Sequence, residues 1–497
     1  MPSSPGKVEG KGWGMIKFAA DFSRPTRMLR RALGPAQVST DETARHAASL
    51  DNLRVSFLPA AVIFPKDDAA IATVLRLANE HRVPVTPRGA GSSTTGSACP
   101  VRGGWVLDLS RWNKIKIDAL AGIAQVEAGA VTAEIDAAAA KHGLFYPPDP
   151  SSLHYCTIGG NLALNAGGLR GAKYGVTRDY VMALEGFLPT GEKVRWGAPL
   201  RKFASGYNLR DLWIGGGGTL GVITGATLRL VPRPAARHTL LAAFANEAKA
   251  LGAVLAIMRA RLVPSICEFL DRPTVICTER KWGRAVFPQM PGASLLLLEV
   301  DGSVAEVAAQ RSALIKLLRS AGAQALRDTA DPAEAEKLWQ VRRTCSQAMF
   351  QMGDAKLNED VVVPPREYVR LLKCTRDLAR ATGLATPTYG HAMDGNFHVH
   401  MMYRRARPRE RRRAEKGVAA LMKKVIALGG AITGEHGIGL AKSPFLRLQH
   451  SPAEIGAMLA VKKALDPRGI LHPGQIFTPV SVWRFPQVKV RLPWDKD

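Results

Sequence analysis

The sequence predicts an α+β protein of two or three domains, on three observations. The chain has 497 residues, whereas a single hydrophobic core rarely serves more than ~250–300. Short apolar runs typical of strands alternate with stretches of helical periodicity along most of the chain. The closely spaced Pro232 and Pro234 follow a strand-like run and predict a domain boundary at that point.

The first half of the chain is predicted to hold a basic, weakly structured lead over residues 1–50 and a domain over residues 51–233. In this domain an apolar run at 60–64 precedes a helix with apolar residues through 71–78, and a second run at 83–86 leads into glycine. Strand, strand and helix patterns follow, and the segment PTGEKVRW predicts a hairpin turn.

Residues 234–478 are predicted to form a second domain, in which strands and helices alternate as in a sandwich of a sheet with helices. Helices are expected at 304–320, across DPAEAEKLWQVRRTCSQAM at 331–349, and at 366–381. Residues 479–497 are expected to be a tail, and their sequence indicates no function.

The net charge of +26 and the pI of about 10.2 raise nucleic acid and anionic membranes as partners. The densest basic run, at 404–416, has no interleaved aromatic residues and leads into a helical pattern, so we expect a solvated helix face and no nucleic-acid site. The basic segment at 15–34 could touch an anionic membrane or act as a targeting segment, although a solvated lead-in is favoured.

Two features bear on the compartment. No apolar run reaches the length of a transmembrane helix, and the N-terminus lacks an apolar core of secretory type. The six cysteines are scattered without a CxxC pair, so neither an iron–sulfur motif nor a Cys-type zinc motif is present, and buried reduced thiols are expected. A cytoplasmic protein is predicted, with peripheral contact at the inner face of the membrane as an open alternative.

Four glycine-rich segments predict a ligand site in the first domain. In PRGAGSSTTG, at 87–96, glycines and hydroxyl side chains can turn several donors toward one pyrophosphate. The spacing fits neither GxGxxG nor a Walker A loop, so by itself this segment could equally be a glycine-rich turn. Because each interior glycine costs ~0.5–1 kcal/mol, further segments at 156–168, 173–181 and 215–224 together predict a long, flat, phosphate-bearing ligand.

The order of these motifs resembles that of the FAD-linked 2-hydroxyacid dehydrogenases, which carry the FAD-binding domain of the vanillyl-alcohol-oxidase/PCMH flavoproteins. The motifs that carry the resemblance are VPVTPRGAGSS, YPPDPSS, TIGGNLALNAGG, GTLGVIT, GHAMDGNFH, GEHGIG and LDPRGILHPGQIF, in the family's order. The resemblance implies a two-subdomain PCMH-type FAD-binding domain at 51–233. It also implies an α+β substrate or cap domain with an antiparallel sheet at 234–478.

The resemblance further implies which residues surround FAD. The first loop would cradle the pyrophosphate, the second motif would lie near adenine and ribose, the third would line the flavin, and the fourth would add backbone contacts. These residues are Arg88, Gly89, Ala90, Gly91, Ser92, Ser93, Pro148, Asp149, Ser151, Thr157, Gly160, Asn161, Gly167, Gly221, Val222 and Ile223. Some relatives attach FAD to a histidine in the first loop. Because this loop reads RGAGSS, FAD is expected to be non-covalent.

Two clusters, YGHAMDGNFHVH and TGEHGIG, gather histidines and acids. If the first is a strand followed by a turn at DGN, His391 and His398 can converge across it. Together with Glu435 they leave open positions on a divalent metal, as in a catalytic site. The resemblance implies Zn²⁺ or a similar ion on these three residues, and polar turn residues without a metal are the alternative.

Three further residues complete the predicted reaction. The resemblance places the active-site histidine at His436, where a neutral imidazole suits a general base. The segment KLWQVRR resembles the family's LWxxR, which makes Arg342 the expected clamp for a substrate carboxylate, with Lys356 as a second candidate. The alternative for Arg342 is a helix-surface arginine.

The predicted function is FAD-dependent oxidation of a small D-2-hydroxy acid, D-lactate or glycolate, to the 2-oxo acid. Because the chain has no cysteine cluster, electrons would leave to a separate acceptor: an iron–sulfur subunit, a cytochrome, quinone or an electron-transfer flavoprotein. One alternative is a D-2-hydroxyglutarate-type dehydrogenase, against which His400 stands where those relatives carry asparagine. The other is a basic nucleic-acid- or membrane-binding protein with a vestigial flavin fold.

Overall fold

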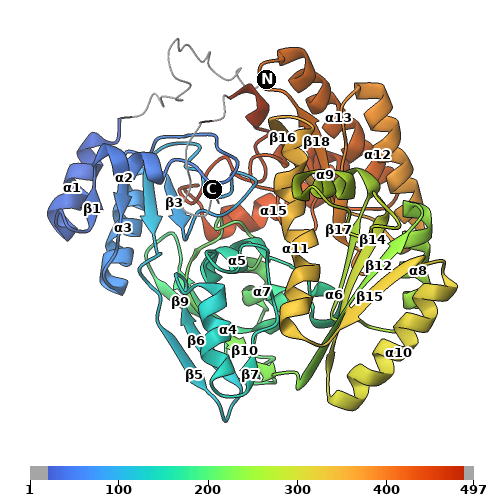
Figure 1. The fold of residues 1–497 in the computed structure, drawn as a ribbon. Coiled ribbons are helices and arrows are strands. Elements are labelled where there is room, and N and C mark those ends of the chain that lie inside the picture. Colours follow the sequence, from blue (N-terminus) through green and yellow to red (C-terminus); the bar gives the residue numbers. More distant parts are fainter. Residues whose placement is uncertain (1–20, 486–487, 489–497) are drawn as a thin grey trace.

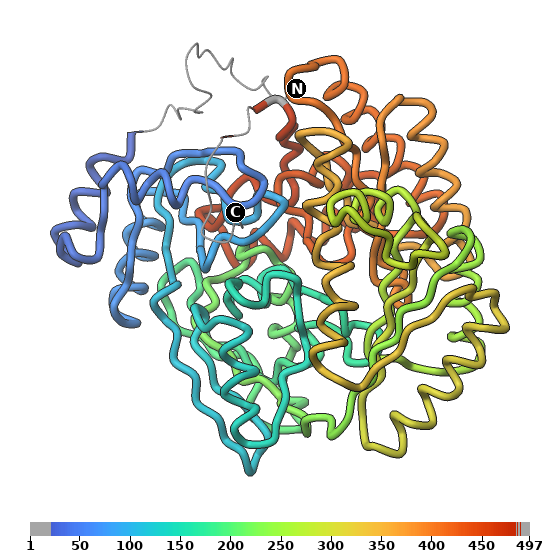
Figure 2. The backbone as a smooth tube through the Cα atoms, in the orientation of Figure 1, coloured from blue at the N-terminus to red at the C-terminus, as the bar shows by residue number. Residues whose placement is uncertain are grey.

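The protein is described by a computed structural model that covers residues 21–485 and residue 488. These residues form sheets of four, five and seven strands and one two-stranded sheet, with helices packed around them (Figure 1). The four- and five-stranded sheets lie in the N-terminal lobe and the seven-stranded sheet in the second lobe. The backbone trace shows the C-terminal segment, in red, returning toward the first lobe (Figure 2).

The first sheet has the strand order β1-β2-β4-β3, with β2, β4 and β3 parallel and β1 antiparallel. Helix α3 begins after Asp67, whose side chain accepts a hydrogen bond from the N–H of Ala70 at 2.8 Å. The strands are β1 (Val38–Ser39), β2 (Ala61–Ile63), β3 (Val85–Arg88) and β4 (Trp105–Asp108), and the helices are α1 (Ser23–Leu33), α2 (Glu42–Ala47) and α3 (Asp68–His81).

Residues 21–50 belong to this first unit, so the prediction of a weakly structured lead is wrong for them. Leu29 of α1 is fully buried, and the indole N–H of Trp105 donates to Thr26 Oγ1 at 2.8 Å. Pro25 lies in the first turn of α1, where its missing N–H has no intrahelical partner to lose. The segment is amphipathic, with its arginines on the exposed side of α1, and this basic character had favoured a solvated lead. Residues 1–20 lie outside the described residues, and membrane contact of this segment stays a prediction.

The second sheet is antiparallel throughout, in the order β5-β6-β10-β8-β9. The turn between β8 and β9 confirms the predicted hairpin. The two sheets form the two expected subdomains, although β1 of the first sheet lies before the expected start at residue 51. The strands are β5 (Ile115–Asp118), β6 (Ile123–Glu127), β8 (Val181–Phe187), β9 (Lys193–Gly197) and β10 (Val222–Arg229), with β7 (Leu144–Phe145) and β11 (Val231–Pro232) paired separately. The helices are α4 (Thr132–Ala140), α5 (Ile158–Leu164), α6 (Gly171–Tyr174) and α7 (Leu209–Trp213).

The seven-stranded sheet, here called the cap sheet, confirms the predicted antiparallel sheet of the second domain. Its order is β15-β12-β14-β13-β17-β18-β16, and every neighbouring pair is antiparallel. The strands are β12 (Ala236–Phe244), β13 (Ile266–Leu270), β14 (Ser294–Gly302), β15 (Ala325–Thr329), β16 (Ala355–Val362), β17 (Thr388–His391) and β18 (Asn396–Tyr403).

Helices cover both faces of the cap sheet. One face packs against α8 (Glu247–Arg259), α10 (Val304–Ser320), α12 (Tyr368–Thr382) and α13 (Pro408–Ala427), and the other against α9 (Arg272–Trp282) and α11 (Pro332–Ala348). The helices predicted at 304–320, 331–349 and 366–381 are therefore confirmed to within about two residues. The basic run at 404–416 leads into α13, where most of its arginines are exposed, as expected of a solvated helix face.

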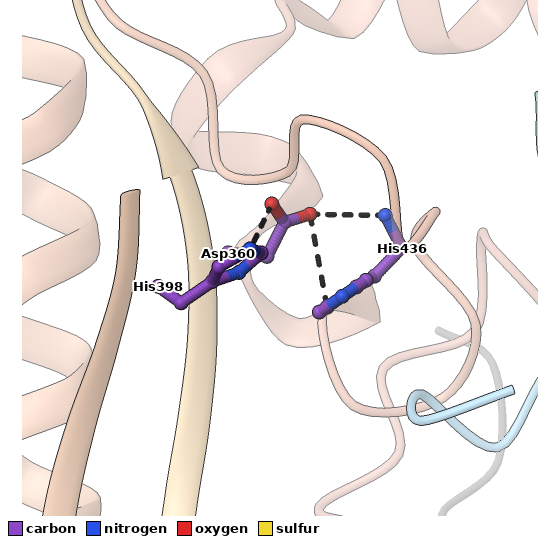
Figure 3. A group of neighbouring side chains, drawn as sticks. All are labelled: Asp360, His398 and His436. Atoms are coloured by element: carbon purple, nitrogen blue, oxygen red, sulfur yellow. Dashed lines mark hydrogen bonds and ion pairs between the residues drawn. The ribbon is translucent and has the colours of Figure 1, made fainter. Parts of the chain in front are cut away.

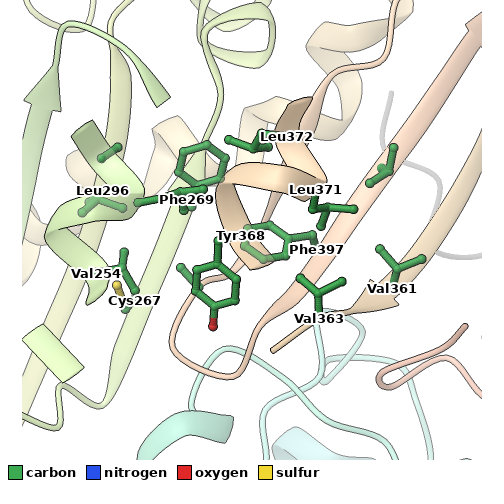
Figure 4. Packing of buried hydrophobic residues seen from close by; sticks show 14 of the residues in the cluster. Val254, Cys267, Phe269, Leu296, Val361, Val363, Tyr368, Leu371, Leu372 and Phe397 are labelled. Atoms are coloured by element: carbon green, nitrogen blue, oxygen red, sulfur yellow. The ribbon is translucent and has the colours of Figure 1, made fainter. Parts of the chain in front are cut away.

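Successive residues of the cap strands point to opposite faces, as the pleat requires. In β18, Phe397, Val399 and Met401 belong to the large apolar core, whereas His398 and His400 point to the other face. Figure 4 shows this core, where the ring of Phe397 lies 5.1 Å from that of Tyr368 and 6.1 Å from that of Phe269. The other face has its own apolar core with α9 and α11, and the histidines of β17 and β18 lie beside it.

The segment after residue 437 packs against the first domain. Thr95 O accepts the N–H of Leu440 at 2.8 Å, and the N–H of His472 donates to Val85 O at 2.8 Å, beside a parallel bridge from Val85 to Leu471. The same segment includes α14 (Leu446–Gln449) and α15 (Pro452–Leu465). Of the predicted tail, Val482 is buried. Within the described chain no helix combines the length and the apolar character that a bilayer crossing requires.

Candidate active site

A cavity of about 1130 Å³ lies between the first domain and the cap sheet. The predicted FAD residues that line it are Arg88, Gly89, Ala90, Gly91, Ser92, Ser93, Asp149, Ser151, Thr157, Gly160, Asn161, Gly167, Gly221 and Ile223. Pro148 and Val222 were also predicted, but neither is among the described residues that line the cavity. Val222 is fully buried in the core of the first sheet, because alternate residues of β10 point away from the cavity.

The first glycine loop is braced by Arg88 from its own strand. The guanidinium donates to the backbone carbonyls of Leu50 at 2.9 Å, Ala98 at 3.2 Å and Ala47 at 3.3 Å. Gly91 has φ of +69°, and a Cβ there would lie 2.1 Å from Arg88 Nη2. Arg88 therefore shapes the loop while its own donors are already engaged.

Other parts of the cavity wall fit a flavin nucleotide. The hydroxyl of Thr157 is buried, lines the cavity and has no hydrogen-bond partner in the described part of the chain. Gly217 and Gly218 also line the cavity, with φ of +62° and +67° that L side chains rarely adopt. An unpartnered buried hydroxyl and glycine backbone open to close approach match the phosphates and polar edge of such a ligand.

The predicted histidine hairpin exists as expected. Strands β17 and β18 are joined by the turn at 392–395, in which Gly395 has φ of +73°. The rings of His391 and His398 lie 5.2 Å apart and nearly perpendicular, and both side chains are buried. The turn thus brings together two imidazoles that are seven positions apart in the chain.

Glu435 reaches this hairpin from the GEHG loop. Its Oε1 lies 3.4 Å from His391 Nε2, 3.6 Å from His398 Nε2 and 3.8 Å from His436 Nε2. One donor atom each from His391, His398 and Glu435 fall within 4.8 Å of one another. The structure therefore gathers the three predicted metal ligands at one point. His398, Glu435 and His436 line the cavity, whereas His391 stands behind them.

Asp360 of β16 holds the GEHG loop in place (Figure 3). Its Oδ2 accepts the backbone N–H groups of Gly434 at 2.9 Å, Glu435 at 3.0 Å and His436 at 3.0 Å, and the hydroxyl of Thr433 at 2.8 Å. The same oxygen lies 3.9 Å from Nδ1 of His436. A single carboxylate thus orients the loop that carries the predicted ligand Glu435 and the predicted base His436.

The electrostatics of the cluster favour a bound cation. Burial lowers the pKa of His398 well below its usual range, and the neighbouring His391 and His436 lower it further. Burial also acts to lower the pKa of His391, but the carboxylates of Glu268 and Glu435 raise it well above its usual range. The two carboxylates therefore attract positive charge to this point, which either a proton or a divalent metal can supply. Two imidazoles and a carboxylate form a donor set suited to Zn²⁺.

The predicted carboxylate clamp lies on α11, one wall of the cavity. Arg342 lines the cavity, stacks on Tyr389 with its guanidinium carbon 4.2 Å from the ring centroid, and donates from Nε to Glu268 Oε2 at 2.5 Å. It is therefore not a helix-surface arginine. Lys356 lies behind the wall and donates to Ser346 Oγ at 2.8 Å, and burial lowers its pKa to about 8.

Sequence reasoning missed Glu268 and Asp360. Each is a fully buried acid in a strand. Glu268 lies among apolar residues in ICEFL, and Asp360 lies in the more polar NEDVV, beside the buried Glu359. A buried carboxylate is rare unless it is paired or functional, and this was the available signal.

Comparisons with known proteins decide the family. A model of FAD binding domains matches residues 59–197, and a model of the C-terminal domain of FAD linked oxidases matches residues 233–476. The glycolate oxidase subunit GlcD of Bacillus subtilis is 38% identical over 90% of this chain and 96% of its own length. The chain belongs to the FAD-linked oxidase family.

Further relatives agree with this membership. A D-lactate dehydrogenase of Anaerostipes hadrus is 35% identical over 90% of this chain and 94% of its own length. The solved structure of p-cresol methylhydroxylase with bound substrate superposes with a TM-score of 0.75 over 92% of this chain and 97% of that one, at 17% identity. That of a 4-ethylphenol oxidase from Gulosibacter chungangensis gives 0.72 over 93% and 98%, also at 17%. These two structures confirm the predicted PCMH-type α+β fold.

As a family member, the protein is an FAD-dependent oxidoreductase. FAD is therefore its cofactor. The family membership therefore favours an enzyme over a nucleic-acid- or membrane-binding protein with a vestigial flavin fold.

Proposed function

We propose that the protein oxidises a small D-2-hydroxy acid, D-lactate or glycolate, to the corresponding 2-oxo acid. The observation that carries the proposal is the convergence of three histidines and Glu435 at the wall of the FAD cavity, with Arg342 on the same cavity. Two relatives that cover most of the chain, named a glycolate oxidase subunit and a D-lactate dehydrogenase, support this substrate class.

The substrate carboxylate is bound by Arg342. Its guanidinium lines the cavity, and its Nε is held by Glu268, so the terminal nitrogens are left to form a two-pronged contact with a carboxylate. Lys356, with a pKa of about 8, adds positive charge behind this position below that pH. The strongly positive net charge of the chain also attracts anionic substrates.

His436 is the proposed base for the hydroxyl proton. Its Nδ1 lies 3.9 Å from Asp360 Oδ2 and its Nε2 lies 3.8 Å from Glu435 Oε1, so two carboxylates flank a ring whose imidazole suits a general base. Its ring stacks on His398 at 5.4 Å and lines the cavity. These contacts orient the imidazole before the substrate arrives.

The bound groups supply the rest of the chemistry. FAD, when present, supplies the acceptor for the Cα hydride. A divalent metal on His391, His398 and Glu435 would supply the Lewis acidity that lowers the pKa of the substrate hydroxyl. FAD is expected to be non-covalent because the first loop contains no histidine. Electrons would then leave to a separate acceptor, a role compatible with the word subunit in the name of the Bacillus relative.

Anaerobic flavin reduction tests the proposal directly. Purified protein is mixed with D- and L-lactate, glycolate and D-2-hydroxyglutarate, and bleaching of the oxidised flavin spectrum is followed by stopped flow. D-lactate or glycolate should bleach the flavin fastest, and L-lactate should be much slower. Faster bleaching by D-2-hydroxyglutarate would move the assignment to that branch, and no bleaching by any 2-hydroxy acid would refute the proposal.

The metal is tested in the same assay. Treatment with a strong chelator, followed by its removal, should abolish bleaching while FAD stays bound. Added Zn²⁺ or Mn²⁺ should restore it. Unchanged bleaching after verified metal removal would show that the histidine cluster acts without an ion.

A further inference from the structure

One buried carboxylate touches both halves of the proposed active site. Glu268 lies in the middle of β13, and its side chain is fully buried. Its Oε1 is hydrogen-bonded to Nδ1 of His391, and its Oε2 accepts the Nε hydrogen of Arg342 at 2.5 Å. Each oxygen therefore serves a different functional residue.

This arrangement follows from the cap-sheet register. Glu268 is directly opposite His391 in the antiparallel pair of β13 and β17, so the two side chains project from the same face. Arg342 reaches the same carboxylate from α11, which packs on that face. Glu268 is absent from the described residues that line the cavity, so it acts through the two residues that it holds.

We propose that Glu268 is a positioning residue that sets the ligating tautomer of His391 and the orientation of Arg342 at the same time. The inference rests on the proposed function, because it gives His391 the role of metal ligand and Arg342 that of carboxylate clamp. It adds a single residue through which the metal site and the substrate site depend on each other.

The tautomer argument is chemical. The arginine Nε can only donate, so Oε2 of Glu268 must accept. The other oxygen, Oε1, also accepts, which places the His391 proton on Nδ1 and leaves the Nε2 lone pair facing the Glu435 side of the cluster. His391 Nε2 lies 3.4 Å from Glu435 Oε1, so a metal held by Glu435 would also meet this nitrogen.

The orientation argument concerns Arg342. Glu268 engages Nε, while Tyr389 packs against the guanidinium plane. These two contacts fix the plane, and the terminal nitrogens make no hydrogen bond with the residues that the structure describes. They remain available for a two-pronged contact with a carboxylate ligand.

The substitution Glu268→Gln tests both arguments with almost no change of shape. Because Arg342 can only donate, the amide oxygen should turn to it and the amide NH₂ should face His391 Nδ1. A donor there forces the His391 proton onto Nε2 and blocks ligation. We expect Zn²⁺ affinity, measured by competition with a chromogenic chelator, to fall about 10- to 100-fold.

Three further variants separate this effect from a general loss of folding. Glu247→Gln changes another buried carboxylate, at the start of α8, that pairs with an arginine, Arg376, and touches neither His391 nor Arg342. It should keep wild-type Zn²⁺ affinity. Arg342→Gln should leave Zn²⁺ affinity within about threefold while the KM for the hydroxy acid rises at least tenfold. In a His391→Ala background, Glu268→Gln should cause no further loss of Zn²⁺ affinity.

The outcomes are distinguishable. Wild-type Zn²⁺ affinity in a folded, FAD-loaded Glu268→Gln variant overturns the inference and leaves the proposed function intact. A wild-type protein that binds no divalent metal would instead refute the metal part of the proposed function. If Glu268→Gln does not fold, the Arg342→Gln variant decides: a loss of Zn²⁺ affinity there would show that the arginine, and not the carboxylate, sets His391.

Discussion

The two faces of the cap sheet use the same strands for opposite purposes. On β18, Phe397, Val399 and Met401 pack into a continuous apolar core with α12 and α13. On the other face of the same strand, His398 meets Glu435 and lies beside Asp360. This second face also has an apolar core, with α9 and α11, so the polar cluster is confined to the part of the face around His391 and His398 that adjoins the cavity.

The largest expected effect comes from the polar face. His436→Asn should lower kcat about 10²- to 10⁴-fold, the usual contribution of a general base, while FAD content and Tm stay near wild type. Single-turnover flavin reduction and thermal unfolding measure the two properties. A strong loss of Tm with kcat retained would contradict the assignment of catalysis to the polar cluster and of stability to the apolar face.

The converse substitution lies on the apolar face. Met401→Ala removes a fully buried side chain and should lower the free energy of unfolding by about 2–5 kcal/mol. Denaturant unfolding checks the stability, and flavin reduction at a temperature where the variant stays folded should retain the wild-type KM. A large rise in KM would show that the two faces are coupled through the strand.

Asp360 lies in the active site and also holds the GEHG loop by hydrogen bonds. Its substitution should therefore affect catalysis and stability together, whereas the two preceding variants separate them. Asp360→Asn replaces a carboxylate that accepts five hydrogen bonds, four at Oδ2 and one at Oδ1 from Asn396, by an amide with one acceptor oxygen. At least one buried donor then loses this partner, at about 1–3 kcal/mol. We expect lower Tm and lower kcat together. The matched control Asp377→Asn, on the exposed side of α12, should change stability by less than about 0.5 kcal/mol.

The smallest expected effect is a pH dependence. Burial lowers the pKa of Lys356 from its ordinary value to about 8, so its positive charge is present below that pH and lost above it. The kcat/KM for a hydroxy acid should therefore fall severalfold as pH rises through about 8. Lys356→Met should remove this fall in kcat/KM at high pH, whereas Lys373→Met, at an exposed lysine of α12, should preserve it.

Much of the fold and part of the site could be predicted from local sequence. The glycine segments, the β8–β9 hairpin and the helix at 304–320 depend on neighbouring residues, and so does the turn that brings His391 to His398. The many arginines of α1 favoured a solvated lead over a packed helix, and the GTLGVIT motif does not reveal which side chains of β10 face the cavity.

The chemical groups of this protein follow from its local sequence: an FAD-binding domain, two imidazoles across a turn, and an acid and a third imidazole in GEHG. How these groups are held depends on the three-dimensional arrangement of the strands. Glu268 meets His391 because β13 pairs with β17, and Asp360 meets the GEHG loop because β16 forms the edge beside β18. Such contacts join residues more than seventy positions apart, and their geometry depends on strand order and register, which no local pattern encodes.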